Sequence, residues 1–363
     1  MKVLIRTDAS LQIGTGHVMR CLTLARELKV QGAQVTFASR EHQGHLCDAV
    51  ESQGFRVLRL STMPHSFDEG RLKHSPWLGA DWQTDATQLE AFLNQEGVEW
   101  DALVVDHYAL DLQWESRLKP WFKRVLVIDD LADRQHDCDL LLDQNLYPDA
   151  PTRYEGLVPP HCEQLLGPRF AMLRPEFQEA RGRVTPRTGH VRHLSVCFGG
   201  VDPTNETAKA LRALQCLRSN ALAIEVITGR HNPHLEELRV LVSEMPNATL
   251  VIEATDMANR FAQADLALGA AGSTSWERAC LGLPTVMIAV ALNQEPIGEG
   301  LATAGAATYL GPACRVSEEE IITELERLMA HPQAIQSMED HASGLVDGNG
   351  TCRVASRLLE GLA

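Results

Sequence analysis

Short apolar runs that alternate with helix-length segments are the feature that most restricts how this chain can fold. In its first half the runs lie at residues 3–5, 34–39, 55–60, 102–106, 124–130 and 139–143. Runs this short, rich in β-branched residues and separated by helical segments, are typical of a parallel sheet covered on both faces. We therefore predict an α/β fold for this half.

The second half repeats the plan. HLSVCFGGVDPTNETAKALRALQ again reads as strand, Gly-Gly turn and helix, and further runs follow at 223–229, 248–254, 264–272 and 284–291. Two successive units of one plan predict two Rossmann-like domains that face each other across a cleft. We assign residues 1–173 to the first domain and 193–363, with a terminal helix, to the second.

Residues 174–192 between them lose periodicity and are predicted to be a linker. This region is either a solvated connector or a positively charged rim of a cleft that binds an anion. It is rich in arginine, with Arg174, Arg181, Arg183, Arg187 and Arg192, and Arg169 lies just before it. Within the first domain, the polar segment 61–100 is predicted to be a loop, including MPHSFDEG, that leads into a helix at TDATQLEAFLNQEG.

Composition narrows the class of function. The chain has 33 basic and 48 acidic residues, and this net charge of −15 argues against a nucleic-acid partner, since such binding relies on neutralisation of phosphates. Hydrophobic residues make up 44% of the chain, enough for full cores. A small anionic ligand stays compatible with this charge, because helix N-termini and a few arginines can hold one.

Cysteine and histidine usage gives no sign of a disulfide framework or a metal site. The nine cysteines form no CxxC pair, and the pairs His42/His45 and His231/His234 lack neighbouring ligands of zinc-site type. MKVLIRTDAS enters a strand directly, without the features of a signal peptide, and no apolar run approaches ~18 residues. We expect a reduced cytoplasmic protein without metal, cofactor or membrane segment; the oligomeric state stays open.

The stretch IGTGHVMRC, residues 13–21, joins the first strand to the first helix. Gly14 and Gly16 permit a tight turn with close approach of a ligand to the backbone, and His17 falls in the first helical turn. A neutral imidazole facing an anion-binding loop suits a general base near neutral pH. A capping or surface histidine is the alternative, because a lone GxG is a weak signal.

Polar residues follow several strands of the first domain. They are Asp8, then Asp106 with His107 and Tyr108, then Asp129 with Asp130. The carboxyl ends of parallel strands meet at one edge of a sheet, so we expect these side chains to lie near His17. We infer that Asp8 orients His17 by accepting its second N–H; for the other carboxylates, helix capping remains an equal alternative.

GAAGSTSWERACLGLP, residues 269–284, predicts a second site. Gly272 opens the backbone after a strand, and Ser273 and Thr274 offer hydroxyl and N–H groups at a helix start, as a diphosphate requires. Glu277 is placed to accept hydrogen bonds from ribose hydroxyls, with a capping box as the alternative. Gly200 in the Gly-Gly turn is a further nucleotide-binding candidate. Asn293 and Gln294 are candidates for the sugar, or else loop caps.

These motifs together resemble a known family. DASLQIGTGHVMRCLTLA, VVDHYALD, IDDLADRQHDCDLLLDQN, LLGPRFAMLRPEF, FGGVDPTNET, GSTSWERACLGLP and DGNG are similar to the hydrolases of pseudaminic acid biosynthesis. Those enzymes cleave UDP-2,4-diacetamido-2,4,6-trideoxy-β-L-altropyranose. The chain resembles more distantly the MurG-type glycosyltransferases of the GT-B fold. The resemblance implies that His17 is the general base and that Tyr108 lies near the sugar. It also implies that the GSTSWE segment binds the nucleotide and that Asn293 and Gln294 line the sugar side.

The expected activity is thus the metal-independent, inverting hydrolysis of a UDP-sugar, with UDP leaving from Ser273 and Thr274. Two alternatives remain at this point. A GT-B transferase would pass the sugar to an acceptor instead of water, on the same fold. A non-catalytic nucleotide-sugar sensor would bind the same ligand and form no product.

Overall fold

The computed structural model describes residues 1–63, 72–217 and 222–362, which divide into two compact units. The first unit comprises Met1–Asn145, Asp149–Met172 and Asn349–Ala363, and the second comprises Leu146–Pro148 and Leu173–Gly348. Most of the segment MPHSFDEG predicted to be a loop lies outside the described residues.

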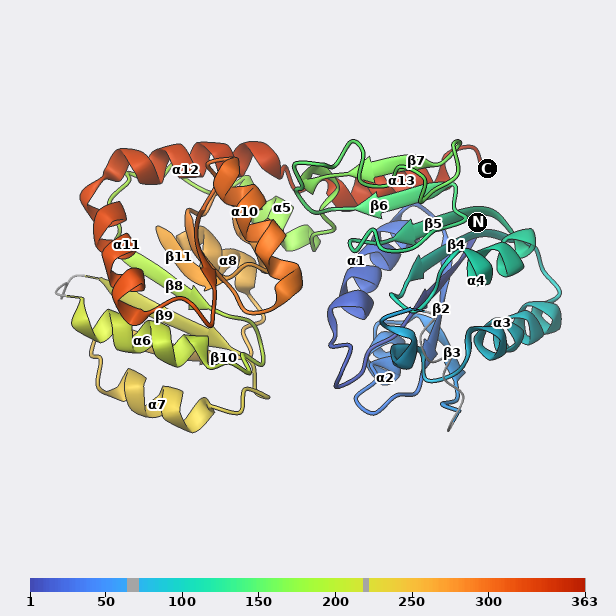
Figure 1. The fold of residues 1–363 in the computed structure, drawn as a ribbon, viewed down its shortest axis with the longest axis horizontal. Helices are drawn as coiled ribbons and strands as arrows, with labels where there is room; N and C mark the ends of the chain where they lie inside the picture. Colours follow the sequence, from blue (N-terminus) through green and yellow to red (C-terminus); the bar gives the residue numbers. More distant parts are fainter. Residues whose placement is uncertain (64–71, 218–221, 363) are drawn as a thin grey trace. The chain divides into compact units, whose positions relative to one another are not determined.

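A parallel sheet of seven strands forms the centre of the first unit as described, in the order β3-β2-β1-β4-β5-β6-β7 (Figure 1). The strands are β1 Lys2–Thr7, β2 Gln34–Arg40, β3 Arg56–Leu60, β4 Trp100–Asp106, β5 Phe122–Ile128, β6 Leu140–Asp143 and β7 Glu163–Leu166. The helices of this unit are α1 Gly16–Val30, α2 Cys47–Ser52, α3 Trp82–Glu96, α4 Leu112–Leu118 and α13 Gly350–Leu359, with 3-10 turns η1 Ser75–Leu78, η2 Lys119–Trp121 and η3 Pro168–Phe170.

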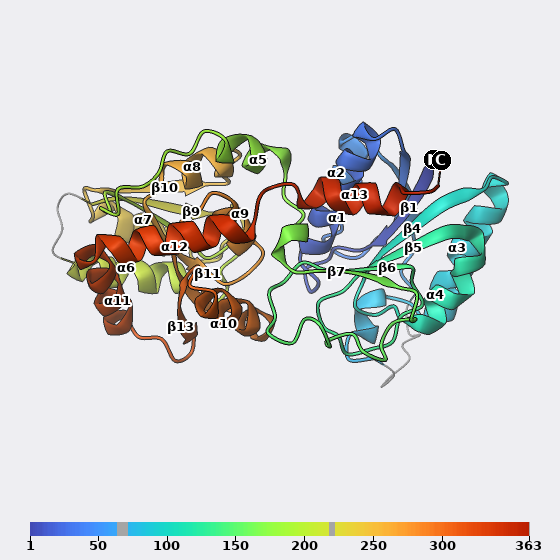
Figure 2. The same ribbon diagram turned by 90° about the horizontal axis from the view of Figure 1, so that it is seen from above.

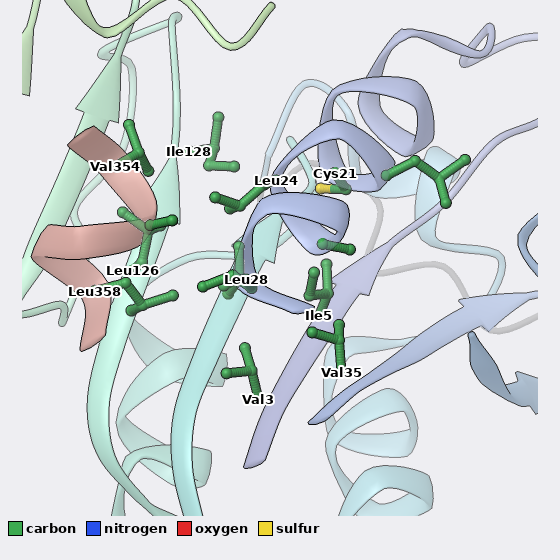
Figure 3. Packing of buried hydrophobic residues seen from close by; sticks show 14 of the residues in the cluster. Val3, Ile5, Cys21, Leu24, Leu28, Val35, Leu126, Ile128, Val354 and Leu358 are labelled. Carbon is green, nitrogen blue, oxygen red and sulfur yellow. The ribbon is translucent and has the colours of Figure 1, made fainter. Parts of the chain in front are cut away.

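Alternate residues of each strand of this sheet supply two separate cores. Val3 and Ile5 of β1 pack with α1 and α13, whereas Leu4 lies in the core formed with α3 and α4. Both cores are apolar because helices cover both faces of the sheet, as the unbroken apolar runs predicted. Figure 3 shows the α1 side, where Leu24 and Leu28 of α1 meet Leu126 of β5.

The second unit has a parallel sheet of six strands in its described part, in the order β10-β9-β8-β11-β12-β13. The strands are β8 His193–Cys197, β9 Ala223–Thr228, β10 Ala248–Ile252, β11 Leu266–Ala270, β12 Thr285–Ala289 and β13 Thr308–Pro312. The helices are α5 Pro175–Arg181, α6 Glu206–Cys216, α7 Leu235–Ser243, α8 Met257–Gln263, α9 Thr274–Cys280, α10 Glu295–Thr303, α11 Glu318–Ala330 and α12 Pro332–Leu345, with the 3-10 turn η4 Leu292–Gln294.

In both sheets the order reverses beside the first strand of the unit, between β1 and β4 and between β8 and β11. Loops at the carboxyl ends of strands on either side of such a reversal diverge and leave room for a ligand. The strands β7 and β13 at the sheet edges were not predicted. Both are short and only partly buried, so their apolar signal is weak.

The prediction that residues 174–192 form a linker is wrong. These residues include α5, which buries Phe177 and Ala180 in the second unit. Arg181 donates to the carbonyl oxygens of Cys280 and Ser343, and Arg187 is buried beside Glu339. Arg181 and Arg187 therefore satisfy carbonyl groups of the second unit, whereas Arg183 and Arg192 are exposed.

The terminal helix was assigned to the wrong unit. α13 packs against α1 and buries Val354 and Leu358 in the first core (Figures 2 and 3). Gly350 at its start fits against the backbone of residue 171, since a Cβ there would lie 2.2 Å from the Ala171 carbonyl oxygen. The sequence order hides this packing because the helix follows the whole second unit.

Among the described residues, none of the helices is both long enough and apolar enough to cross a bilayer.

Truncation of Leu358 to alanine tests the packing of α13. Leu358 is fully buried, so its loss leaves a cavity that is expected to lower the free energy of unfolding by about 2–5 kcal/mol. Urea denaturation followed by circular dichroism measures the change. Glu360→Ala is the control, because it removes only an exposed ion pair with Arg357, worth about 0–1 kcal/mol. Equal stabilities for the two variants would show that α13 is not part of the core.

Candidate active site

The first candidate site lies where β1 and β4 end. A turn after β1 leads into α1, and Gly14 adopts a φ of 78°, in the left-handed region that favours glycine. The Gly14 N–H donates to the Ser10 carbonyl oxygen over 2.9 Å. Gly16 begins α1 and is exposed, and no side chain in the described part of the chain caps the helix start. The turn thus leaves the backbone of this helix start open, as the sequence predicted.

His17, in the first turn of α1, is held by two charged residues. Its Nδ1 lies 2.6 Å from Oδ1 of Asp106, the last residue of β4. Arg20, one helical turn further, donates from Nε and Nη2 to the two oxygens of the same carboxylate, each over 2.6 Å. The spacing of three residues places His17 and Arg20 on one face of α1, so both meet Asp106.

The charge of Asp106 fixes the hydrogen on the imidazole. Burial alone would raise the pKa of Asp106, but the Arg20 guanidinium and His17 lower this pKa well below its usual range. An ionised carboxylate only accepts, so in the neutral imidazole the hydrogen lies on Nδ1 of His17 and Nε2 presents a lone pair. The His17 side chain is 10% exposed. A desolvated imidazole oriented in this way can remove a proton from water.

The aromatic ring of Tyr108 packs against the imidazole of His17. Their ring centroids are 4.6 Å apart and the rings are nearly perpendicular, at 84°. The Tyr108 hydroxyl donates to Asp130, which follows β5, and Arg20 Nη1 lies 3.5 Å from the other oxygen of Asp130. Burial and the Asp130 charge raise the pKa of Tyr108 well above its usual value, so the hydroxyl stays protonated. Arg20 therefore connects the carboxylates that hold His17 and Tyr108.

The structure contradicts the inference that Asp8 orients His17. Asp8 is fully buried and accepts two hydrogen bonds from Arg6, over 2.6 and 2.8 Å, and one from the Arg40 N–H. Ser39 also donates to Asp8, and the Nε2 atoms of His107 and His42 lie 3.2 and 3.6 Å from its carboxylate. Because consecutive residues after β4 point to opposite sides, His107 meets Asp8 while Asp106 and Tyr108 meet His17. Asp8 belongs to a buried charge network that extends to Asp85.

Asp143, at the end of β6, is a titratable group that the sequence did not mark. Burial and the charge of Asp130 raise the pKa of Asp143 to about 7. Its carboxyl accepts a hydrogen bond from the Tyr154 hydroxyl over 2.9 Å. The edge of this sheet therefore carries carboxylates held ionised, among them Asp106, beside Asp143, which titrates near neutral pH.

The second candidate site is the turn between β11 and α9 in the other unit. Gly269 must be glycine, since a Cβ would lie 2.3 Å from the Cys197 carbonyl oxygen of the neighbouring strand β8. A Cβ on Gly272 would lie 3.2 Å from Nε2 of Gln294, so the side-chain amide of Gln294 sits beside the turn. Ser273 is exposed at the helix start and its side chain caps nothing there. The turn thus presents the hydroxyl of Ser273, while the half-buried Thr274 hydroxyl accepts a hydrogen bond from Arg278 Nη1 over 3.4 Å.

Glu277 does not form the capping box that was its alternative role. Its carboxylate lies 3.5 Å from Arg174, which also pairs with Glu176 over 2.9 Å. Burial raises the pKa of Glu277, against the attraction of Arg174. Arg174 was counted as part of a linker, and the structure places it against the predicted ribose-binding residue.

Three further predicted residues lie at the same edge of the second sheet. Gly200 follows β8, next to β11 in the sheet, and its carbonyl oxygen accepts the Gly229 N–H over 3.1 Å. Gln294 accepts the Val290 N–H over 3.0 Å, which is the loop-capping role foreseen as its alternative. Asn293 is exposed. The predicted nucleotide residues therefore gather at one edge of the second sheet.

Three features of these sites were missed. Arg20 and Arg278 were not considered, although the i, i+3 spacing of His17 and Arg20 within GHVMR was a readable signal. The link between Tyr108 and Asp130 depends on strand order, which the sequence leaves open.

The described residues contain no group of three or more His, Cys, Asp or Glu side chains placed to hold a metal ion.

Comparison with known proteins gives relatives for both halves. Residues 194–351 match the glycosyltransferase family 28 C-terminal domain. The chain is 29% identical over 307 residues to the UDP-2,4-diacetamido-2,4,6-trideoxy-beta-L-altropyranose hydrolase of Campylobacter jejuni, covering 84% of this chain and 97% of that protein. It is 31% identical over 193 residues to the spore coat polysaccharide biosynthesis protein SpsG of Bacillus subtilis, covering 53% and 57%.

Among solved structures, MurG of Acinetobacter baumannii aligns with a TM-score of 0.70 over 99% of both chains, at 16% sequence identity. At this identity the likeness concerns the fold, which is the GT-B fold of two Rossmann-like domains, as predicted. The chain thus has the GT-B fold, its residues 194–351 match the glycosyltransferase family 28 C-terminal domain, and it is similar over most of its length to the UDP-2,4-diacetamido-2,4,6-trideoxy-beta-L-altropyranose hydrolase.

Proposed function

We propose that this protein is an enzyme that acts on a nucleotide sugar, and specifically a UDP-sugar hydrolase. Its proposed substrate is UDP-2,4-diacetamido-2,4,6-trideoxy-β-L-altropyranose, from which it releases UDP and the free sugar for pseudaminic acid synthesis. The similarity over 84% of the chain to a hydrolase of that name supports the substrate. The fold is shared with glycosyltransferases, so the residues around His17 must carry the choice of reaction.

The observation that carries this proposal is the contact of 2.6 Å between His17 Nδ1 and Asp106, itself clamped by Arg20. In the proposed step Nε2 of His17 takes a proton from water while the water oxygen bonds to the anomeric carbon. The bond from that carbon to the diphosphate oxygen breaks, and its electron pair leaves with UDP. Attack opposite the leaving group inverts the anomeric configuration.

The second unit is proposed to hold the leaving group. Backbone N–H groups at Gly272 and the hydroxyls of Ser273 and Thr274 are assigned to the diphosphate, and Glu277 to the ribose hydroxyls. Gly200 leaves space for the nucleotide at the same sheet edge. Since protein groups alone neutralise the diphosphate in this assignment, the proposed reaction needs no metal ion and no cofactor.

The remaining candidates are assigned to the sugar and to the turn beside the base. Asn293 and Gln294 carry amides that match acetamido and hydroxyl groups in hydrogen-bonding capacity. Tyr108 is proposed to contact the sugar through its ring, since its hydroxyl is engaged by Asp130. Gly14 and Gly16 are proposed to let the sugar approach the backbone on either side of Thr15 in the turn before His17.

A transferase of the MurG type is the second candidate. The observation in its favour is 30% identity over 193 residues to the UDP-N-acetylglucosamine transferase of Pseudomonas paraeruginosa, although that match covers about half of each protein, 51% and 52%. Such an enzyme would use His17 to deprotonate an acceptor hydroxyl in place of water. The requirement for an acceptor separates the two reactions in an assay.

Replacement of His17 by asparagine tests the general base. Asparagine can still hydrogen-bond in the turn, so the fold and the affinity for UDP are expected to stay within about threefold of the wild type. Turnover is expected to fall by about 10²–10⁴-fold, the usual contribution of a positioned base. UDP release measures turnover, and calorimetry measures affinity.

His161→Asn is the matched control, because this histidine is largely exposed beside Asp139. It should retain wild-type turnover. If His17→Asn also turns over within a few-fold of the wild type, His17 is not the base and GHVMR has only a structural role.

Replacement of Asp106 by asparagine tests the positioning of the base. The amide keeps the shape of the side chain but can donate to Nδ1, which places the hydrogen on the wrong nitrogen of His17. We expect kcat to fall by about 10²-fold or more, with KM and UDP affinity nearly unchanged.

Asp48→Asn removes a carboxylate from an exposed ion pair with Arg59 and serves as the control for loss of one negative charge. A parallel loss of UDP affinity in Asp106→Asn would indicate general disruption of the protein. Unchanged kcat would remove Asp106 from the mechanism.

A further inference from the structure

Arg278 is a buried cation without a carboxylate partner in the described part of the chain. It lies in α9 and is 1% exposed. The other buried arginines each form an ion pair: Arg6 with Asp8 and Asp85, Arg40 with Asp85, Arg134 with Asp129, and Arg187 with Glu339. Burial of an unpaired charge is costly, so the absence of a partner for Arg278 requires an explanation.

Neutral groups surround the Arg278 guanidinium. Nη2 donates to the Ala270 carbonyl oxygen over 2.7 Å and to Ser275 Oγ over 3.2 Å, and Nη1 donates to Thr274 Oγ1 over 3.4 Å. Nε is buried with no hydrogen-bond partner among the described residues. Burial lowers the pKa of Arg278 to about 10, and the charge of Glu277 opposes this only in part. Glu277 itself is engaged by Arg174. Hydrogen bonds therefore orient this cation but do not neutralise it.

The position of Arg278 indicates where its countercharge belongs. Nη1 lies 2.9 Å from the place that a Cβ on Gly269 would take, directly behind the turn that leads to Gly272 and Ser273. That turn is open on its other side, where Ser273 is exposed. Electrostatic attraction is screened less in a region of low dielectric than in water. An anion bound at the turn would therefore be attracted by the Arg278 guanidinium without direct contact.

We propose that Arg278 is the countercharge of the nucleotide diphosphate and sets the preference of the turn for a diphosphate over an uncharged nucleoside. This assignment rests on the proposed binding of UDP at residues 269–274. It makes Arg278 a specificity-determining residue that acts through the turn. The other buried arginines each pair with a carboxylate of the protein. For Arg278, the bound diphosphate would supply the negative charge instead.

The test compares Arg278→Met and Arg278→Lys with the wild type. Calorimetry or NMR titration gives the dissociation constants for UDP and uridine, and thermal unfolding gives the stability without ligand. For Arg278→Met we expect UDP affinity to fall by about tenfold or more and uridine affinity to stay within twofold. The melting temperature without ligand should be equal to or higher than that of the wild type, since an unpaired buried charge is removed.

Arg278→Lys keeps the charge but loses the fork that binds Ala270 and Ser275. Its ratio of UDP to uridine affinity should stay within about threefold of the wild type, which also provides the test if the methionine variant does not fold. Arg239→Met, at an exposed position of α7, makes the same change in net charge and should leave both affinities unchanged.

Three results would overturn the proposal. The first is an equal proportional loss of UDP and uridine affinity in Arg278→Met, which would indicate that Arg278 only shapes the turn. The second is retention of UDP affinity within twofold in Arg278→Met. The third is loss of the UDP preference in Arg278→Lys. Failure of the wild type to bind UDP would instead refute the proposed function.

Discussion

The carboxylate of Asp106 accepts hydrogen bonds from the His17 imidazole and the Arg20 guanidinium while it is shielded from solvent. An ionised carboxylate is stable there only because Arg20 lies beside it, and the orientation of His17 depends on that charge. Arg20 also reaches Asp130, which accepts the Tyr108 hydroxyl. The arrangement of the first site thus depends on one ion pair between α1 and the end of β4.

Buried arginines that pair with carboxylates stabilise the fold of this protein, whereas a buried arginine without such a partner is a candidate for ligand binding. A buried network below the edge of the first sheet neutralises its own charges through ion pairs and hydrogen bonds among Arg6, Arg40, Asp8 and Asp85. Such a network holds strand ends in place. Arg278 has no such partner among the described residues, and its position behind a glycine- and hydroxyl-lined turn suits an anionic ligand. An unpaired buried charge costs stability, and costs of this kind concentrate at functional sites.

Local patterns predicted the two Rossmann-like units, and the glycine turns at residues 14–16 and 269–272 lie where expected, because strand, turn and helix signals are contiguous in sequence. Contacts between distant segments were not predictable in this way. Asp8 and Asp106 both lie where a strand ends, so the sequence pattern does not distinguish them. Only the direction of the Asp106 side chain brings it, rather than Asp8, into contact with His17. α13 completes the first core from the far end of the chain, and residues 174–192 pack on the second unit, although both patterns suggested otherwise.

The origin of the oxygen in the released sugar tests the central claim most directly. Incubation of UDP-2,4-diacetamido-2,4,6-trideoxy-β-L-altropyranose with the protein in H₂¹⁸O, followed by NMR and mass spectrometry, identifies the bond that breaks. If His17 directs water at the anomeric carbon, the label enters the free sugar, UDP stays unlabelled, and the first anomer formed has the inverted configuration. Label in the phosphate products, a sugar phosphate with UMP, or release of UDP only when an acceptor is present would contradict the account.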